Sequence, residues 1–564
     1  MRHLIISAFM LSAFSLSAGA FATADEHSPL IDEPSGIAIP TYLTDDYIST
    51  IDTAYYGGWE YSVGGGVAAF DCNDDDYPEL YVAGGQSKAA LYINQSGLGK
   101  ALIFSRSSQQ TLQIDKVIGA YPIDINADGM MDLMTLRMGE NILFKGLGNC
   151  EFERANEQWN FDGGDAWSTA FSATWEAGQK WPTLAIGNYL DRKTEGKPAG
   201  RCDDNKLFRP AKNFNTFGAP QKLGAFCTLS LLFSDWDRSG KQALRVSHDG
   251  WEKLNIWGMG IANYDVDGDG YSDYFLTSMG NNNLQMHIGD GQQPTYKDMA
   301  VKLGITAHKP WNAEGKLLST AWHAQFADVN NDGLIDLFIS KGNVDKMPDF
   351  ARNDPNNLLL QQLNGQFFEA AGPAGLLSTA KSRGALVVDL NVDGLLDIVH
   401  VVVDEGLSLF RNLGTNTDNI IAGHDDIAQS RKQQSQPLNN WLSIKLNNKN
   451  GDNNANVNAN INGNINAIGA WIEVKTGDKI QRQEVTIGGG HASGMAVAHH
   501  FGIGTATTAQ VRVEWPLENK TAASFWSEWL EVKANHLMVI NKATSGAILS
   551  ATMRLPPTSA KPIN

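Results

Sequence analysis

The segment GIANYDVDGDGYSDYFLTSMG, residues 260–280, places an acidic stretch between two short apolar runs. Each run is too short for a typical helix, and both are rich in the alternating, β-branched and aromatic residues of strands. The stretch between them, DVDGDGYSD, consists mainly of aspartate and glycine, which favour tight turns. The segment therefore predicts a β-hairpin whose turn carries carboxylates.

The same pattern occurs at four other places in the chain. The copies read GGGVAAFDCNDDDYPELYVAGG from Gly64, GAYPIDINADGMMDLMTLRMG from Gly119, AWHAQFADVNNDGLIDLFISKG from Ala321 and RGALVVDLNVDGLLDIVHVVV from Arg383. Most successive copies are roughly 50 to 60 residues apart, a spacing that suits β-propeller blades of four strands. Apolar segments such as ALYINQ near Leu91 and NLLLQQLNGQFFEA near Leu358 follow the hairpins and would supply the outer strands.

The long interval between the second and third copies predicts two decayed repeats. They are LAIGNYLDR, with Asn188 and Asp191, and LLFSDWDRSGKQALRVS, with Asp235, Asp237 and Ser239. Counting both gives seven units, whereas the short step from Asp235 to the next acidic stretch leaves six as the alternative. The predicted fold class is all-β, with a seven-bladed or six-bladed propeller at residues 57–415.

The five strong acidic stretches carry oxygen-bearing side chains at their first, third, fifth and ninth positions. These residues are Asp71, Asn73, Asp75, Glu79, Asp124, Asn126, Asp128, Asp132, Asp265, Asp267, Asp269, Asp273, Asp328, Asn330, Asp332, Asp336, Asp389, Asn391, Asp393 and Asp397. Hard oxygens at alternating positions can wrap a cation, and the backbone carbonyl of the seventh residue would add a ligand. Their number and hardness favour Ca²⁺ over Mg²⁺ or zinc. The pattern predicts about five structural calcium sites, one in each loop.

The sixth position of these loops must allow a positive φ for so tight a wrap. It is glycine in four loops and Asp76 in the first, and aspartate tolerates that region better than most residues. The loops are not EF-hands, because the last carboxylate is at the ninth rather than the twelfth position and strands replace the helices. The loop at Asp235 has Ala243 at its ninth position and is expected to be a poor metal site.

Taken together, the repeats resemble the FG-GAP (VCBS-type) repeats of integrin α-subunit propellers over about residues 57 to 415. The resemblance implies seven blades. It also implies that the metal is structural and clamps each hairpin turn at the edge of its blade.

A small β-sandwich-like domain is expected at residues 438–543, after a polar linker at 416–437. Its alternating segments are NNWLSIKL, GAWIEVKTG, QRQEVTIGGG, HHFGIG and AQVRVEWP. This part resembles the ASPIC/UnbV domain, which follows an FG-GAP propeller in the cartilage acidic protein family. The matching marks are Asn440-Trp441-Leu442, Gly469-Ala470, His500-Phe501-Gly502-Ile503-Gly504 and Val513-Glu514-Trp515-Pro516. An Asn-rich insertion at 447–466 is expected to be a solvated loop, and residues 544–564 a tail.

The N-terminus predicts export. Arg2 precedes an apolar stretch, and small residues at Ala20 and Ala22, or at Ala22 and Ala24, fit a cleavage site. Residues 1–22 are expected to be a signal peptide, followed by an N-terminal segment at 23–56. No other apolar run reaches the roughly 18 residues of a membrane span. The expected location is secreted or periplasmic, free or at the cell surface.

That compartment is oxidising, so the four cysteines can pair, and three pairings are open to them. Cys202 and Cys227 flank one Gly/Pro/Asn-rich stretch and are expected to form a disulfide. Cys72 and Cys150 are then left as a second pair.

The net charge and the absence of known catalytic motifs argue against nucleic-acid binding and against several enzyme classes. Lys+Arg 44 against Asp+Glu 62 gives a formal net charge of -18, which argues against nucleic acid as a partner. No G-x-S-x-G, Walker or Rossmann motif occurs, and His491, His499 and His500 lack the spacing of a zinc or base motif. We expect no catalytic residues and a non-enzymatic propeller that binds an unidentified protein or glycan. The alternatives are an extracytoplasmic polysaccharide lyase or hydrolase that uses a propeller face, and a periplasmic assembly factor.

Overall fold

The computed structural model describes residues 37–44, 51–192, 201–249, 256–306, 319–344, 355–415, 439–448, 463–516, 525–543 and 548–561. The chain divides into two compact units, residues 1–37 and 38–564, and all helices and strands named below belong to the second. The expected signal peptide, the linker at 416–437 and most of the Asn-rich insertion lie outside the described residues. Within the described ranges, every helix is too short or too polar to cross a membrane.

Seven successive antiparallel units make up the described strands of the propeller. The first three are β2 (Val67–Phe70), β3 (Glu79–Val82), β4 (Ala90–Asn94) and β5 (Phe104–Arg106); β6 (Val117–Ile123), β7 (Asp132–Gly139), β8 (Ile142–Gly148) and β9 (Glu151–Arg154); and β10 (Ala166–Thr174), β11 (Thr183–Asn188), β12 (Asp204–Phe208) and β13 (Gln221–Ala225). The next three are β14 (Thr228–Ser234) and β15 (Ala243–His248); β16 (Gly258–Tyr264), β17 (Asp273–Ser278), β18 (Asn283–His287) and β19 (Tyr296–Asp298); and β20 (Ala321–Ala327), β21 (Asp336–Lys341), β22 (Asn357–Gln361) and β23 (Phe367–Glu369). The seventh contains β24 (Ser382–Val388), β25 (Asp397–Val402) and β26 (Gly406–Thr415).

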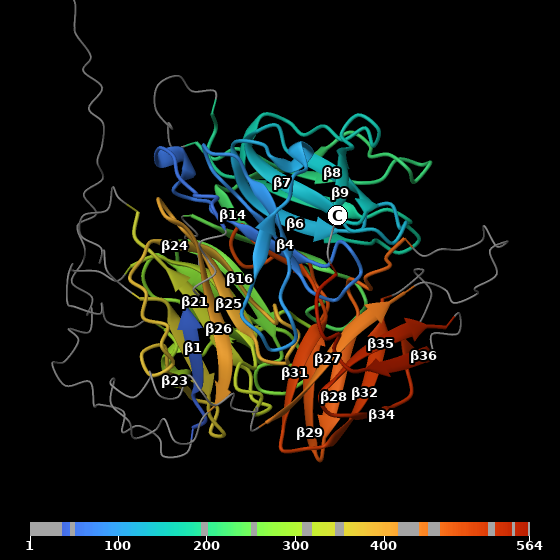
Figure 1. The fold of residues 1–564 in the computed structure, drawn as a ribbon. Coiled ribbons are helices and arrows are strands. Elements are labelled where there is room, and N and C mark those ends of the chain that lie inside the picture. Colours follow the sequence, from blue (N-terminus) through green and yellow to red (C-terminus); the bar gives the residue numbers. More distant parts are fainter. Residues whose placement is uncertain are drawn as a thin grey trace, which may run out of the picture. The chain divides into compact units, whose positions relative to one another are not determined.

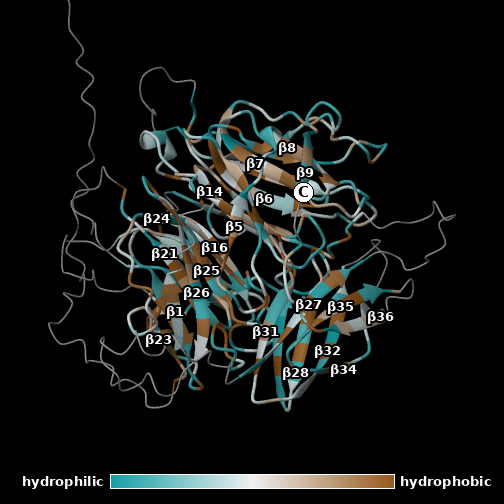
Figure 2. Ribbon diagram, in the orientation of Figure 1, coloured by the Kyte–Doolittle hydropathy of each residue, from teal (hydrophilic) through white to brown (hydrophobic). Residues whose placement is uncertain are grey.

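The first strands of the units are the innermost ones. β2, β6, β10, β14, β16, β20 and β24 contact one another in this order, and β24 contacts β2, so the ring is closed. Nearly all their residues are buried, and their sequences are made mostly of apolar and small residues. In Figure 2 hydrophobic residues concentrate on the propeller strands. Helical structure in the described ranges is limited to η2 (Trp59–Tyr61), η3 (Gln110–Leu112) and α1 (Ala300–Leu303), and the all-β prediction is confirmed.

The seventh unit is completed by a strand from the other end of the propeller sequence. β1 (Pro40–Thr44) pairs antiparallel with β26, and the two lie side by side in Figure 1. Residues 23–56 were expected to precede the propeller, whereas β1, which lies within them, is part of the seventh unit. Because the array is circular, the pairing joins its first and last strands and covers the edge that β26 would otherwise expose.

The C-terminal domain is built from two sheets. One has the order β31 (His499–Gly504), β27 (Asn440–Asn447), β35 (His536–Lys542) and β36 (Ile548–Arg554), and the other has the order β29 (Lys479–Glu484), β28 (Trp471–Thr476), β32 (Thr508–Trp515) and β33 (Phe525–Trp526), with β34 (Leu530–Lys533) beside β32. Ile444 and Ile540 of the first sheet share one buried cluster with Ile472 and Val511 of the second. The expected sandwich is present, but β36 lies in the segment that sequence analysis left as a tail.

Residues 487–496, which we name the plug, leave the C-terminal domain after β29 and enter the ring of inner strands. The amides of Gly489 and Gly490 donate to the carbonyls of Leu231 in β14 and Ile261 in β16, at 2.7 and 2.6 Å. Within the plug, β30 (Gly494–Ala496) pairs in parallel with β2. Sequence analysis extended the strand before it through all three glycines, whereas β29 ends at Glu484.

The plug also reaches the remaining inner strands. Ser172 in β10 donates its hydroxyl to the carbonyl of Ile487 at 2.6 Å, and the amide of Ala120 in β6 donates to the carbonyl of Ala492 at 3.2 Å. A Cβ atom on Gly384 in β24 would collide with the plug. His491 of the plug contacts β20, as described below. The plug therefore contacts all seven inner strands and occupies the centre of the ring.

Glycine makes this close packing feasible on both sides of the contact. A Cβ atom on Gly66, just before β2, or on Gly119, in β6, would lie well inside 3.0 Å of the carbonyl oxygen of Ala492. In the plug, residues 488–490 are glycines with positive φ, a region that glycine adopts without steric cost. The plug and the inner strands can therefore approach this closely only because these positions carry no side chain.

Two buried histidines meet where the plug crosses β20. The amide of His491 donates to Nδ1 of His323 at 3.0 Å, and the His491 ring lies 4.9 Å from that of Trp322. Burial lowers the pKa of His323 to about 4. Burial, with the nearby Arg383 guanidinium, lowers the pKa of His491 to about 3. Both side chains are therefore neutral at neutral pH.

We expect His323 and His491 to contribute a fall in the free energy of unfolding as the pH drops from about 6.5 to about 4. In this window the unfolded chain protonates both histidines and the folded chain does not, so protons favour the unfolded state. His323→Asn, which keeps an acceptor for the His491 amide, should reduce the loss by roughly 1 kcal/mol per pH unit. Urea unfolding across the window tests this, and a difference between variant and parent that stays constant with pH would contradict it.

Both expected disulfides are present. Cys202 is bonded to Cys227 and Cys72 to Cys150, with sequence separations of 25 and 78. Cys72 is the second residue of the first acidic loop and Cys150 follows β8, so this bridge joins the first two units of the propeller.

Replacing both Cys202 and Cys227 by serine is expected to lower the free energy of unfolding by about 3 kcal/mol, because the bridge restricts a loop of about 26 residues in the unfolded chain. Chemical denaturation of the oxidised parent and the double variant measures the effect. Equal midpoints would show that this bridge does not stabilise the fold.

Candidate metal centres

Each of the five strong acidic stretches is the turn between the first two strands of a propeller unit. In every case the residue before the first aspartate pairs with the ninth residue of the loop: Phe70 with Glu79, Ile123 with Asp132, Tyr264 with Asp273, Ala327 with Asp336 and Val388 with Asp397. The ninth carboxylate therefore begins the second strand. The predicted hairpins are present, and all five acidic turns lie at the same end of the inner strands.

The first, third and fifth side chains hold the turn by accepting hydrogen bonds from its backbone. In the fourth of these loops Asp328 accepts from the amides of Asp332 and Gly333 at 3.1 and 2.7 Å. Asn330 accepts from the amide of Asp332 at 3.1 Å, and Asp332 accepts from that of Leu334 at 2.7 Å. The same pattern in the first loop shows that the backbone winds around a set of inward oxygens.

The ninth carboxylate is buried and ties the loop to two strands. One oxygen accepts from the amide of the second loop residue in all five loops, at distances of 2.9, 2.8, 2.9, 3.0 and 3.0 Å in chain order. In the last four loops the other oxygen accepts from the third strand of the same unit, through the amides of Gly146, His287, Gln361 and Asn412. This residue therefore supports the hairpin whether or not a cation is bound.

Positive φ angles occur at the fourth as well as the sixth position. The sixth position has them at Asp76 and at four glycines, as the sequence predicts. Sequence analysis missed the fourth position, where Ala127 has φ 61° and Val392 has φ 59°. A β-branched residue in this region is strained, so the loop geometry, rather than local preference, imposes the conformation.

Two observations test whether a cation fits these loops. Oxygens of Asp265, Asp267 and Asp269 all lie within 4.8 Å of one another. Oδ1 of Asp265 and Oδ1 of Asn391 are buried without a hydrogen-bond partner among the described residues. A buried oxygen without a partner is costly, and convergent hard oxygens are the ligands that Ca²⁺ takes. The first and third positions of these loops therefore fit a divalent cation.

The electrostatics of the loops point the same way. Burial raises the pKa of Asp273 to about 8 and that of Asp393 to about 6, and neighbouring carboxylates add to the shift at Asp273. Burial followed by repulsion from the fifth carboxylate raises the pKa of Asp328 and of Asp389 well above the ordinary range. A cation among these oxygens would offset both the desolvation and the repulsion.

The two decayed repeats have different outcomes. Asn188 ends β11 and Asp191 follows it, so this segment connects the second and third strands, and the proposed repeat there is wrong. The turn between β10 and β11 has no matching acidic pattern. The segment at Asp235 is a true hairpin turn, in which Asp235 accepts from the amides of Ser239 and Gly240 at 3.0 and 2.7 Å.

This decayed loop contacts the C-terminal domain through its fourth residue. The guanidinium of Arg238 lies over the rings of Trp471 and Trp526, 4.6 and 4.9 Å from their centroids. It also forms an ion pair with Glu514 at 2.7 Å. The loop that lost its ninth carboxylate thus supplies an arginine to the domain interface, where such stacking is favourable.

Basic residues of β29 lie over two of the intact loops. Arg482 donates to a carboxylate oxygen of Asp265 at 3.1 Å and to the carbonyl of Gly268 at 2.9 Å. Lys479 donates to the carbonyl of Gly333. Sequence analysis did not identify these residues, since nothing in the local pattern of β29 places it against the acidic loops.

The three histidines considered in the sequence are in three different environments. His491 is in the plug, and a nitrogen of the His500 ring is 2.6 Å from Oδ1 of Asn331, the fourth residue of its loop. His499 faces a cavity between the propeller and the C-terminal domain. These contacts give His491 and His500 structural partners.

Comparison with family models supports both resemblances. Residues 265–339 match the FG-GAP-like repeat, a range that begins at the third acidic loop and includes the fourth. Residues 460–547 match the ASPIC and UnbV family, and this range contains the plug. The recognition of an FG-GAP propeller followed by an ASPIC/UnbV domain is confirmed. No curated protein matches the chain.

Several solved structures align with the chain at low similarity. BBS1N in complex with ARL6DN has a TM-score of 0.37 and 11% identity, covering 66% of this chain and 97% of its own. Sqt1 of Saccharomyces cerevisiae has a TM-score of 0.34 and 11% identity, covering 67% and 100%. An Agrocybe aegerita lectin that recognises non-reducing terminal N-acetylglucosamine has a TM-score of 0.30 and 14% identity, covering 63% and 81%.

Proposed function

We propose that this chain is a secreted or periplasmic calcium-binding propeller that binds a protein or a glycan and has no enzymatic activity of its own. Calcium has a structural role in the proposal and holds the hairpin turns at one end of the inner strands. The ligand is engaged elsewhere on the propeller, and the C-terminal domain is a fixed part of the same body.

Calcium binding is supported by the convergence of carboxylate oxygens from Asp265, Asp267 and Asp269, and by Oδ1 of Asp265, which is buried without a hydrogen-bond partner among the described residues. Ca²⁺ would be held by the first, third, fifth and ninth side chains of each loop. Both disulfides support an oxidising compartment, where millimolar calcium would be available.

Exposed aromatic residues support a binding role at the end of the inner strands away from the acidic loops. Phe226 precedes β14 and Trp257 precedes β16, and they are 41% and 48% exposed. Aromatic side chains with this exposure contribute strongly to protein interfaces. Both residues lie at the end of the inner strands opposite the acidic loops. The contacts of the C-terminal domain with the acidic loops, described above, are at the other end.

Protein and glycan arrays probed with the full chain in Ca²⁺ test the proposal. We expect saturable binding to at least one immobilised ligand, reduced by Trp257→Ala and retained by the matched variant Leu363→Ala, whose side chain is 95% exposed in a distant turn. Binding should weaken in chelator. Turnover of a soluble polysaccharide by the purified chain would replace the proposal with the lyase or hydrolase alternative.

A further inference from the structure

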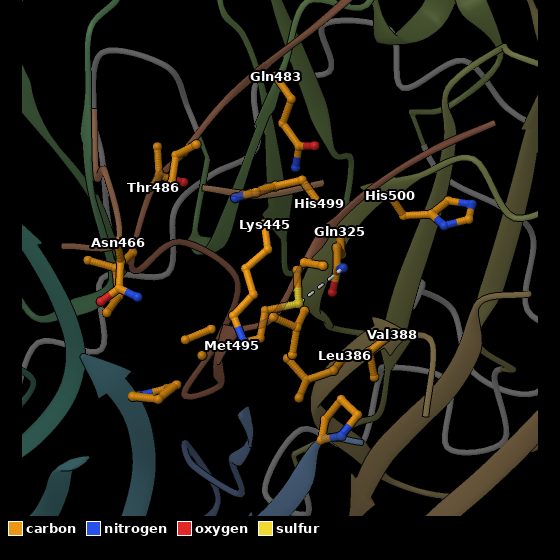
Figure 3. Close-up of a pocket in the computed structure, with 18 of the residues that line it drawn as sticks. Gln325, Leu386, Val388, Lys445, Asn466, Gln483, Thr486, Met495, His499 and His500 are labelled. Atoms are coloured by element: carbon orange, nitrogen blue, oxygen red, sulfur yellow. Dashed lines mark hydrogen bonds between the residues drawn. The ribbon is translucent and has the colours of Figure 1, made fainter. Parts of the chain in front are cut away.

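A cavity of about 410 Å³ lies between the inner strands of the propeller and the C-terminal domain. It is on the side of the acidic loops and runs beside the plug. The volume falls in the range of roughly 300 to 1,000 Å³ that is typical of small-molecule sites. Figure 3 shows Lys445, Gln483, Met495 and His499 among the residues that line it.

The propeller wall of the cavity contains an apolar patch. Leu386 and Val388 come from β24, Ile123 comes from β6, and Met495 comes from the plug. These side chains are carried by strands of the closed ring, so this wall is rigid. The patch offers contact surface without hydrogen-bonding groups, as the greater part of a ligand pocket does.

The opposite wall belongs to the C-terminal domain and carries polar groups among apolar ones such as Leu446 and Val485. Asn466, Gln483, Thr486 and His499 line it. No side-chain hydrogen bond or ion pair joins these four to any of the described residues. Two amides, a hydroxyl and an imidazole, none of them bonded to another described residue through its side chain, can therefore donate to and accept from a molecule in the cavity. Burial lowers the pKa of His499 to about 4, so its ring is neutral and offers one donor and one acceptor.

The charges that line the cavity disfavour an anion. Nζ of Lys445 lies 3.5 Å from a carboxylate oxygen of Asp71 and 3.8 Å from one of Asp76. Asp74, Asp389 and Glu484 also line the cavity, so carboxyl groups outnumber ammonium groups among its described lining residues. These carboxylates would repel an entering anion, whereas they would not repel a neutral ligand.

We propose that the cavity binds a neutral polyhydroxylated molecule of the size of a mono- or disaccharide. The hydroxyl groups of the ligand face Asn466, Gln483, Thr486 and His499, and its carbon-bound hydrogens face the apolar patch. The site is separate from the exposed aromatics of the proposed function and does not rest on them. It belongs to neither domain alone, since each contributes one wall.

Isothermal titration and thermal shift of the full chain in Ca²⁺ test this, with glucose, N-acetylglucosamine, maltose and trehalose as probes and glucuronic acid as the anionic comparison. We expect at least one neutral sugar to bind with a stoichiometry of one and to raise the melting temperature with increasing concentration. Gln483→Leu should weaken that binding about tenfold, the effect of losing roughly one hydrogen bond.

Gln510→Leu is the matched control, because Gln510 is an exposed residue of β32 in the same domain, and it should bind as the parent does. Thr486→Val, which removes one hydroxyl and keeps the shape, gives a second test if Gln483→Leu does not fold. The proposal is overturned if no neutral sugar binds, if glucuronic acid binds as tightly, or if Gln483→Leu and Thr486→Val both leave binding unchanged.

Discussion

Excess chelator is expected to lower the melting temperature of the full chain by on the order of 10 °C, and Ca²⁺ should restore it. The five loops gather buried carboxylates whose pKa values are raised by desolvation and mutual repulsion, and a bound divalent cation relieves both. At free Ca²⁺ about 100 times the dissociation constant, each site adds about 2.7 kcal/mol. Mg²⁺ should rescue poorly, because it demands a smaller octahedral cage.

A pair of matched variants assigns the effect to the loops. Asp267 and Asp237 both occupy the third position, and each accepts one hydrogen bond from the fifth residue, both at 3.2 Å. Asp267→Ala should remove one bound ion and part of the stability gained from Ca²⁺, whereas Asp237→Ala should do much less because its loop has no ninth carboxylate. Ion counting by mass spectrometry and melting curves measure both. Melting curves indifferent to chelator and to Asp267→Ala would reduce these loops to ordinary turns.

Gly66→Ala is expected to destabilise the protein by on the order of 3 kcal/mol, since overpacking costs about 1 to 3 kcal/mol and here the obstacle is backbone. The added Cβ would overlap the carbonyl of Ala492, so the plug must shift away from β2 and β6. The φ of Gly66 is not positive, so the effect is steric rather than a matter of backbone strain. Hydrogen exchange should accelerate at the amides of Gly489 and Gly490, which bond to inner strands.

Gly218→Ala provides the control for this change. The atom nearest to an added Cβ there is the carbonyl oxygen of Arg209 at 3.5 Å, an ordinary contact distance. Its unfolding midpoint should match the parent. An unchanged midpoint and unchanged exchange in Gly66→Ala would mean that the plug does not occupy the ring as described.

The acidic hairpin loops were predictable because their information is local. A carboxylate at the ninth position pairs across the hairpin with the residue before the first, so spacing alone determines which side chains converge. The two disulfides were likewise accessible from the sequence. The positive φ at Ala127 and Val392 was not, because no residue preference marks it and the loop imposes it.

The plug could not be predicted, because its partners on the inner strands are far from it in the sequence. The segment GGGHASGMAVA, residues 488–498, has no alternation that marks a strand, and its glycines read equally well as a turn. The strand β1 was missed for a related reason, since only the closed ring shows that residues 40–44 complete the seventh unit. The error at Asn188 and Asp191 came from reading acidic residues without the strand order.

The position of the plug in the chain has a consequence for biogenesis. All strands of the propeller lie before residue 416, and the segment that fills its channel lies after residue 486. A polypeptide that emerges N-terminus first therefore presents a complete set of blades around a hollow axis until its last portion arrives. Late nonsense mutations or proteolytic clipping would leave that axis empty and wet, exposing buried backbone of seven strands to proteases. Resistance of the propeller to proteolysis would thus indicate that the chain had been synthesised through the plug.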